Sequence, residues 1–237
     1  MDTARHKADK PVITSVIVPA YNERQGLPIV LEKLLKITNN NYEVIVIDDG
    51  SNDGTSEVAA SFPVRIIKHE KNLGKGEAIK TGIKNARGQN IICIDADDTY
   101  PVDVIPQMAE YLQSYDVVIG SRFYGRQNIP RFNRLGNYII RNLIKYIYGF
   151  KPFDPLTGLW GVKKQYAEKI LPYARYAPDA EMQMKAARMK LRMQDIRINY
   201  GARVGDTKLP SVKGGYEHFK LILTLLRWRP DGKGYNQ

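Results

Sequence analysis

The chain has 237 residues, of which 43% are hydrophobic and 26% are charged, and this composition excludes a disordered protein and favours one large domain with a substantial core. Its single cysteine, Cys93, excludes a disulfide framework and a cysteine-built zinc site, and favours a reducing compartment. No run approaches 18 apolar residues and the first ten residues have no apolar core, so neither a spanning helix nor a secretory signal is expected.

The formal net charge of +11 is unevenly distributed along the chain. Residues 1–121 hold 13 Lys/Arg and 17 Asp/Glu, a net charge of −4. Residues 122–237 hold 23 Lys/Arg and 8 Asp/Glu, a net charge of +15. A basic half of this kind indicates an anionic partner, for which nucleic acid, an anionic membrane and a phosphorylated substrate are the candidates.

The pattern of the acidic half, residues 1–121, predicts alternating strands and helices. Runs rich in Val and Ile, each short enough for a buried strand, cover residues 12–18, 43–48, 64–69 and 90–95. Helical spacing of apolar residues covers residues 27–37, 53–61 and 75–86, with Asp53 as the expected N-cap of the second helix. This alternation predicts a parallel sheet covered by helices.

Carboxylates gather where three of these strands end, which is where parallel sheets bind their ligands. They are Glu23, Asp48, Asp49, Asp95 and Asp97. Aspartate is common in turns and at helix N-caps, which explains the carboxylates at any one strand end. Carboxylates that gather from three strand ends repel one another unless a cation or sugar hydroxyls lie between them. Asp95-Ala96-Asp97 is the sharpest feature, because two carboxylates at i and i+2 can turn toward one hard cation such as Mg²⁺ or Mn²⁺.

Other kinds of site have little support. The chain has no P-loop motif and no G-x-G-x-x-G after its first strand, and its three histidines are scattered. The glycine-rich segment 72–78 is either a plain turn or a set of backbone N–H groups beside a nucleotide, with Lys75 close by.

Two segments of the basic half are amphipathic. In 131–149, a helix would place Arg134, Tyr138, Arg141 and Lys145 on one face, and Leu135, Ile139, Leu143 and Ile147 on another. The segment 216–230 ends an apolar run in Arg227-Trp228-Arg229. Each fits either a helix packed on the core or one lying at an anionic bilayer surface. No nucleic-acid-binding motif accompanies them, so nucleic acid is not expected as a partner.

An ordered set of motifs carries a family resemblance. The motifs are VIVPAYNE (16–23), VIDDGSNDGT (46–55), NLGKGEA (72–78), DADDTYP (95–101) and IGSRF (119–123). Together they resemble glycosyltransferase family 2, and within it the polyprenyl-phosphate (dolichol-phosphate) hexose synthases, over residues 14–213. The resemblance implies an α/β fold of the GT-A type, a single Rossmann-like domain with a mostly parallel central sheet flanked by helices, plus basic amphipathic C-terminal helices.

The expected domain organisation follows from the same resemblance. Residues 1–11 form a flexible N-terminus and residues 12–237 form the GT-A domain. Within it, residues 12–121 bind the nucleotide sugar, and residues 122–237 bind the acceptor and face the membrane.

The resemblance also implies roles on the donor side. The nucleotide-sugar-binding residues would be Pro19, Tyr21, Glu23, Asp49, Lys75, Asp95, Ala96 and Asp97. Asp95 and Asp97 would be the metal ligands for Mg²⁺ or Mn²⁺, and Asp97 would also contact the diphosphate. Residues 154–158 would shape the donor-sugar pocket, and Glu181 would lie near the sugar. The chain departs from the family pattern at Thr99, where a glutamine is common, and at Trp160, where an arginine is usual.

On the acceptor side, Arg122 is expected to face the acceptor phosphate. The other cations that can hold this phosphate are Arg131, Arg134, Arg203 and Lys208. Arg203 and Lys208 belong to a segment that resembles the family's loop over the phosphates. Asp97, Arg122, Glu181, Arg203 and Lys208 are the expected catalytic residues.

The expected function is inverting transfer of a hexose from a UDP- or GDP-linked sugar to a polyprenyl (dolichyl or undecaprenyl) phosphate. The protein would act peripherally at the cytoplasmic face of a membrane, and a membrane-anchoring partner protein is left open. The alternative is a family 2 enzyme with a saccharide hydroxyl acceptor, in which Glu181 or Asp179 would act as base. A remote alternative is a non-catalytic membrane- or nucleic-acid-binding module.

Overall fold

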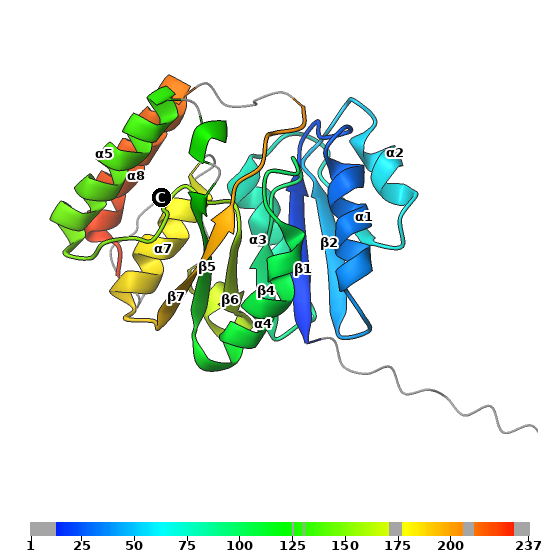
Figure 1. Ribbon diagram of the computed structural model, residues 1–237, viewed down its shortest axis with the longest axis horizontal. Helices are drawn as coiled ribbons and strands as arrows, with labels where there is room; N and C mark the ends of the chain where they lie inside the picture. Colours follow the sequence, from blue (N-terminus) through cyan, green and yellow to red (C-terminus); the bar gives the residue numbers. More distant parts are fainter. Residues whose placement is uncertain (1–12, 125, 130, 171–176, 206–210, 230–237) are drawn as a thin grey trace, which may run out of the picture.

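A computed structural model describes residues 13–124, 126–129, 131–170, 177–205 and 211–229, and the expected flexible segment 1–11 lies outside them. The described residues form one seven-stranded sheet with helices on both of its faces (Figure 1). The strands are β1 (Thr14–Ala20), β2 (Tyr42–Asp48), β3 (Arg65–Lys68), β4 (Asn90–Cys93), β5 (Val117–Tyr124), β6 (Trp160–Lys163) and β7 (Met193–Asn199). The α-helices are α1 (Leu27–Ile37), α2 (Thr55–Ala60), α3 (Lys75–Asn85), α4 (Ile105–Ser114), α5 (Arg131–Tyr148), α6 (Lys164–Ala167), α7 (Pro178–Arg188) and α8 (Ser211–Thr224). Short 3₁₀ turns cover η1 (Val102–Val104), η2 (Arg126–Asn128) and η3 (Leu225–Arg227).

The strand order is β3-β2-β1-β4-β6-β5-β7. β1 pairs in parallel with β2 and β4, β2 with β3, and β5 with β7, whereas β6 runs antiparallel to both of its neighbours. The predicted mostly parallel sheet is therefore confirmed. The ends of the four predicted strands shift by no more than two residues. Residues 121 and 122 both lie in β5, so one sheet spans the two expected halves of the chain, and their chemical division stays a prediction.

Apolar runs form the inner strands because helices cover both of their faces. On one face, α1 buries the stripe of leucine and valine at 27, 30, 31 and 34. On the other face, α3 approaches β1 so closely that a Cβ on Gly82 would lie 2.5 Å from the Ile17 side chain. The N-cap of α2 is Gly54 with φ +94°, so the expectation for Asp53 was wrong by one residue. Asp53 still accepts the Thr55 N–H at 3.0 Å.

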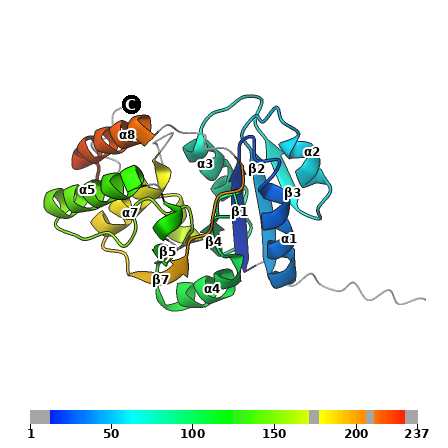
Figure 2. The ribbon, with the colours of Figure 1, turned by 45° about the horizontal axis from the view of Figure 1, so that its top comes forward.

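Helices α5, α7 and α8 share a separate apolar cluster at one end of the sheet, where α5 and α8 run side by side beyond β5 and β7 (Figures 1 and 2). The helix predicted over 131–149 is confirmed as α5, but its buried side differs from the predicted aliphatic face. Ile140 and Ile144 are buried, whereas Leu135 and Ile139 are 58% and 55% exposed. This difference arises because α7 and α8 pack on only one flank of the apolar face of α5.

Candidate functional site

An acidic centre lies directly after β4, where Asp95-Ala96-Asp97 leaves the sheet. The start of α1 packs on this segment, since a Cβ on Gly26 would lie 2.6 Å from the Ala96 carbonyl oxygen. Asp97 is 3% exposed, and its Oδ1 accepts the Thr99 hydroxyl at 2.6 Å and the Thr99 N–H at 3.1 Å. Thr99 therefore orients the carboxylate from the position where the family often has glutamine.

Arg203 joins two carboxylates of this centre. Its Nη1 donates to Asp97 Oδ2 and its Nη2 to Glu23 Oε1, both at 2.6 Å. The Val204 N–H also donates to the Asp97 carbonyl at 3.0 Å, so the segment after β7 is fixed against the D-x-D. Burial raises the pKa of the Asp97 carboxyl, the charge of Asp95 adds to the rise, and Arg203 opposes it. The centre thus holds more negative charge than its surroundings tolerate without cations.

Lys75 neutralises the other side of the centre. Its Nζ lies 2.8 Å from Asp95 Oδ1 and 2.8 Å from Asp179 Oδ2. Trp160 Nε1 donates to the second Asp179 oxygen at 2.8 Å. Burial lowers the pKa of Lys75, but the Asp179 and Asp95 carboxylates more than offset this and hold it well above its usual range. Lys75 is thus a fixed cation beside Asp95, at the start of α3.

From the sequence, Asp179 was expected only as an alternative base and not among the residues around the D-x-D. Asp179 and Glu181 are two residues apart on α7, so their side chains point to nearly opposite sides of the helix. Glu181 is fully buried and pairs with Lys185 at 2.6 Å, whereas Asp179 reaches Lys75. The clue was its place in the first turn of a helix that begins at Pro178. A catalytic role for Glu181 stays a prediction, and its burial in an ion pair favours a structural one.

The residues expected around the nucleotide lie at the ends of β1 and β2. Pro19 and Tyr21 are half-buried there. Asp49 is 2% exposed, and its carboxylate accepts the Leu73 N–H at 2.9 Å and the Gly74 N–H at 2.7 Å. Asp49 therefore shapes the glycine-rich segment before α3, and its place among the nucleotide-sugar-binding residues stays a prediction.

Gly158 allows Asp95 to reach its position. A Cβ at Gly158 would lie 2.0 Å from Asp95 Oδ2, a distance that no side chain tolerates. The Gly158 N–H donates to the Tyr100 hydroxyl at 2.6 Å, which keeps the backbone in place. The segment expected to shape the sugar pocket thus contacts the D-x-D directly.

We predict that Gly158→Ala lowers any turnover that depends on this centre about 10- to 100-fold, because the new methyl group displaces the Asp95 carboxylate by about 1 Å or more. Gly136→Ala on α5 is the matched control, since a Cβ there meets nothing within 4 Å among the described residues. Steady-state kinetics of both variants check this, together with their melting temperatures. Equal turnover for the two variants would show that the position of Asp95 does not matter.

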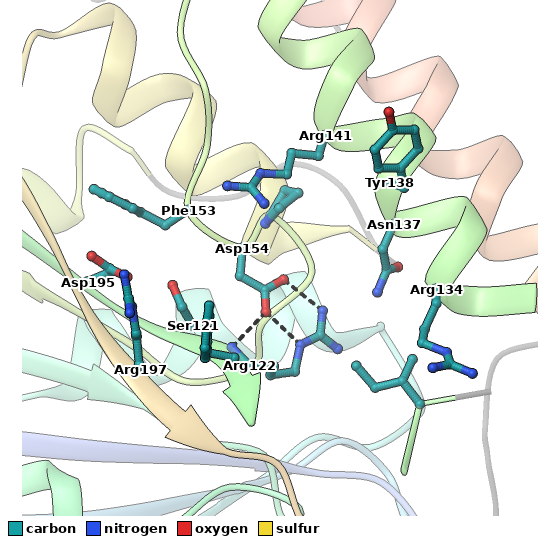
Figure 3. Close-up of a pocket in the computed structure, with 13 residues that line it drawn as sticks. Ser121, Arg122, Arg134, Asn137, Tyr138, Arg141, Phe153, Asp154, Asp195 and Arg197 are labelled. Carbon is teal, nitrogen blue, oxygen red and sulfur yellow. Dashed lines mark hydrogen bonds and ion pairs between the residues drawn. The ribbon is translucent and has the colours of Figure 1, made fainter. Parts of the chain in front are cut away.

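A cationic pocket of about 430 Å³ lies between the ends of β5 and β7, the loop 153–155 and α5 (Figure 3). Its lining residues are Ser121, Arg122, Phe123, Ile129, Arg134, Asn137, Tyr138, Arg141, Phe153, Asp154, Pro155, Asp195 and Arg197. Arg122 forms a two-pronged ion pair with Asp154, with Nε–Oδ2 at 2.7 Å and Nη2–Oδ1 at 2.8 Å. Burial acts to raise the pKa of Asp154, but Arg122 holds it below its usual range.

The structure divides the cations expected to hold an acceptor phosphate. Arg122 and Arg134 line the cationic pocket, and Arg203 lies in the acidic centre instead. Arg131 is exposed on α5 and is not among the described residues that line the pocket. Lys208 lies outside the described residues.

Aromatic residues connect the acidic centre to the cationic pocket. The Arg122 guanidinium lies 5.3 Å from the Tyr200 ring, and Tyr200 packs edge-on against Tyr100 at 5.3 Å. Tyr100 in turn bonds to Gly158, which touches Asp95. Two sites of opposite charge therefore share one end of the sheet.

The acidic centre fits a divalent cation, although the described residues contain no group of three or more His, Cys, Asp or Glu that could hold a metal ion by itself. Asp95 and Asp97 offer hard oxygen ligands, and such ions often keep positions for substrate phosphates. In the structure, Lys75 pairs with Asp95 and Arg203 pairs with Asp97, so these two side chains supply positive charge at the centre.

Comparison with known proteins decides the family. The model of the family described as glycosyl transferase family 2 matches residues 15–171. The chain belongs to glycosyltransferase family 2. Its relatives in this family include a dolichyl-phosphate hexose transferase of Haloferax volcanii, which is 30% identical over 85% of this chain and 88% of the relative. A dolichol-phosphate mannosyltransferase of Pyrococcus furiosus is 31% identical over 90% of this chain, which spans 64% of that longer protein.

The fold of this family 2 glycosyltransferase is the GT-A fold. The crystal structure of glucosyl-3-phosphoglycerate synthase from Mycobacterium tuberculosis, in complex with Mn²⁺, UDP and phosphoglyceric acid, superposes with a TM-score of 0.71. The two chains are 23% identical, and the match covers 90% of this chain and 77% of the other. The predicted family and fold are both confirmed.

Proposed function

We propose that this family 2 enzyme transfers a hexose from a nucleotide sugar to a polyprenyl phosphate at a membrane surface. The observation that carries the proposal is the cationic pocket next to the acidic centre, an arrangement suited to an anionic acceptor beside a donor diphosphate. The Haloferax volcanii relative, named as a dolichyl-phosphate hexose transferase, supports the same acceptor class.

The donor would bind at the acidic centre. Asp95 and Asp97 would hold a divalent metal, Mg²⁺ or Mn²⁺, which supplies charge neutralisation for a diphosphate when bound. Arg203 lies within reach of the same place and can turn from Glu23 and Asp97 toward phosphate oxygens. Lys75, whose Nζ lies 2.8 Å from Asp95 Oδ1, would hold the Asp95 carboxylate in position while the donor binds.

The acceptor phosphate needs cations rather than a base. A phosphate monoester is already ionised at pH 7, so its oxygen can attack the anomeric carbon directly. A hydroxyl acceptor would need a general base within reach. Both acids considered for that role are already engaged in ion pairs, Glu181 with Lys185 and Asp179 with Lys75, and Asp179 also accepts from Trp160. The contacts of these residues thus favour a phosphate acceptor over a saccharide hydroxyl.

Direct attack from the face opposite the leaving nucleotide inverts the anomeric centre, so we expect a β-linked product from an α-linked donor. Incubation of the full chain with UDP- and GDP-linked hexoses, Mg²⁺ or Mn²⁺ and a short polyprenyl phosphate tests the reaction, and NMR of the product tests its anomeric form. Transfer to a saccharide in the absence of lipid phosphate, or an α-linked product, would contradict the proposal.

We place the outer surface of α5, α8 and η3 against an anionic bilayer. Its large exposed side chains are Leu135, Tyr138, Ile139, Tyr146, Tyr216, Phe219, Leu223 and Leu226. Exposed cations such as Lys145 and Lys220 lie on the same helices, a combination typical of interfacial helices. Tyr138 is 68% exposed and also lines the cationic pocket, so the pocket opens beside this surface. The described residues include no helix that is long and apolar enough to cross a membrane. The choice of the cytoplasmic face and an anchoring partner protein stay predictions.

We predict that Ile139→Glu combined with Leu223→Glu lowers the partition of the protein onto phosphatidylglycerol vesicles at least about tenfold, because each change removes apolar burial worth roughly 1.5–3 kcal/mol. Ile13→Glu is the control, since Ile13 is 46% exposed but precedes β1, away from α5 and α8. Co-sedimentation with vesicles measures the partition. If the double variant still binds like the control, this surface meets something other than a bilayer.

A further inference from the structure

One part of the cationic pocket has no task in the reaction described above. Ser121 on β5 is paired in register with Arg197 on β7, and both line the pocket together with Arg141 of α5. Figure 3 shows Ser121 and Arg197 on the sheet side of the pocket and Arg141 above them, with Asp154 between this group and Arg134.

The Ser121 hydroxyl points to a missing ligand. Ser121 is 8% exposed, and its Oγ is buried with no hydrogen-bond partner among the described residues. Buried hydroxyl groups in native proteins are nearly always hydrogen-bonded, since an unmade bond costs the desolvation of the group. An O–H group at the floor of a cationic pocket can donate to an anionic oxygen.

The arginines of this group are held in place without being neutralised. Arg141 donates its Nε–H to the Pro152 carbonyl at 3.0 Å, and the Arg197 guanidinium lies 4.6 Å from the Phe123 ring. Neither has a carboxylate within ion-pair distance in the part of the chain that the structure describes, whereas Arg122 is fully matched by Asp154. The pocket's four arginines and two aspartates leave a net charge of +2, which favours the binding of a phosphate group.

We propose that Ser121, Arg141 and Arg197 form a phosphate subsite, in which the hydroxyl and the two guanidinium groups donate to phosphate oxygens. Asp195 also lines the pocket beside them, and its negative charge lowers the net positive charge of the subsite. In this arrangement Arg122 and Asp154 act as a positioning pair that forms the wall of the subsite. The phosphate belongs either to the polyprenyl acceptor or to a phospholipid head group at the same surface, and the acceptor assignment rests on the proposed function.

Titration of the full chain with a short polyprenyl phosphate and with inorganic phosphate tests the subsite directly. Arg197→Gln is expected to weaken phosphate binding about tenfold, as loss of a charged hydrogen bond does. Ser121→Ala is expected to weaken it severalfold without lowering the melting temperature, because the hydroxyl makes no bond within the described protein. Arg65→Gln is the control, since Arg65 lies in β3 at the opposite edge of the same sheet.

Two further readouts separate the sources of the phosphate. A higher KM for polyprenyl phosphate in Ser121→Ala and Arg197→Gln assigns the subsite to the acceptor. Weaker binding to phosphatidylglycerol vesicles with an unchanged KM assigns it to a phospholipid head group. Unchanged titrations in both variants, with transfer to lipid intact, overturn the subsite alone. Weakened titrations in a protein that transfers no hexose keep the subsite and overturn the proposed function.

Discussion

Asp97→Asn is expected to lower hexose transfer by about 10²–10³-fold while leaving the fold intact. Asparagine has the same shape and can still accept both Thr99 hydrogen bonds at its Oδ1. It lacks the negative charge that the Arg203 guanidinium now meets at 2.6 Å and that a divalent metal requires. The loss should appear in turnover and in the metal concentration needed for half-maximal activity.

Asp98→Asn is the matched control for this prediction. Asp98 is the next acidic residue in the chain, but its carboxylate bonds to Lys33 at 2.6 and 2.7 Å, away from Arg203. Its φ of +60° suits asparagine as well as aspartate. We expect near-normal turnover from this control. Normal turnover and metal dependence in Asp97→Asn itself would remove Asp97 from the donor site.

The sequence predicted the first four strands well because their signal is local. Each is a short run of Val and Ile, and burial on both faces demands such a run. The strand ends were predicted for the same reason, so the D-x-D was expected after β4, where the structure has it. β6 gave no such signal, since it is four residues long and acquires its antiparallel place only between β4 and β5.

The pairing within the site could not be predicted from local pattern. Arg122 was expected to be available to a phosphate. Its guanidinium instead donates two hydrogen bonds to the carboxylate of Asp154, which lies 32 residues further along the chain. The contact between Gly158 and Asp95 likewise depends on how the 154–158 segment crosses the end of the sheet. The family resemblance named these segments as parts of the site, and the tertiary fold decides which side chains neutralise one another.

The uneven charge acquires a structural meaning in the same way. The acidic half brings Glu23, Asp95 and Asp97 together, and the basic half sends Arg203 back to them. Part of the remaining positive charge lies in the cationic pocket and on α5 and α8. Opposite charges that are far apart in the chain thus meet at one end of the sheet.

Lys185→Met is expected to destabilise the protein by about 3–5 kcal/mol, the largest stability effect that we predict for a single side chain. Lys185 and Glu181 are both 0% exposed and lie 2.6 Å apart on α7. Burial lowers the pKa of Lys185, and the charge of Glu181 opposes this, so the two charges depend on each other. Methionine fills the space of the lysine stem but removes the ammonium group that lies 2.6 Å from the Glu181 carboxylate.

Adding Glu181→Gln to Lys185→Met should restore most of that stability, because it replaces the buried negative charge with a neutral polar group. Urea unfolding of the wild type, both single variants and the double variant gives the interaction free energy. The Trp228 ring lies 5.5 Å from Lys185 Nζ and Trp160 donates to Asp179 on α7, so tryptophan fluorescence reports local loosening around α7. The double variant also separates the two roles considered for Glu181. Hexose transfer at close to the wild-type rate would make Glu181 a structural residue, whereas a stable protein that has lost transfer would make it catalytic.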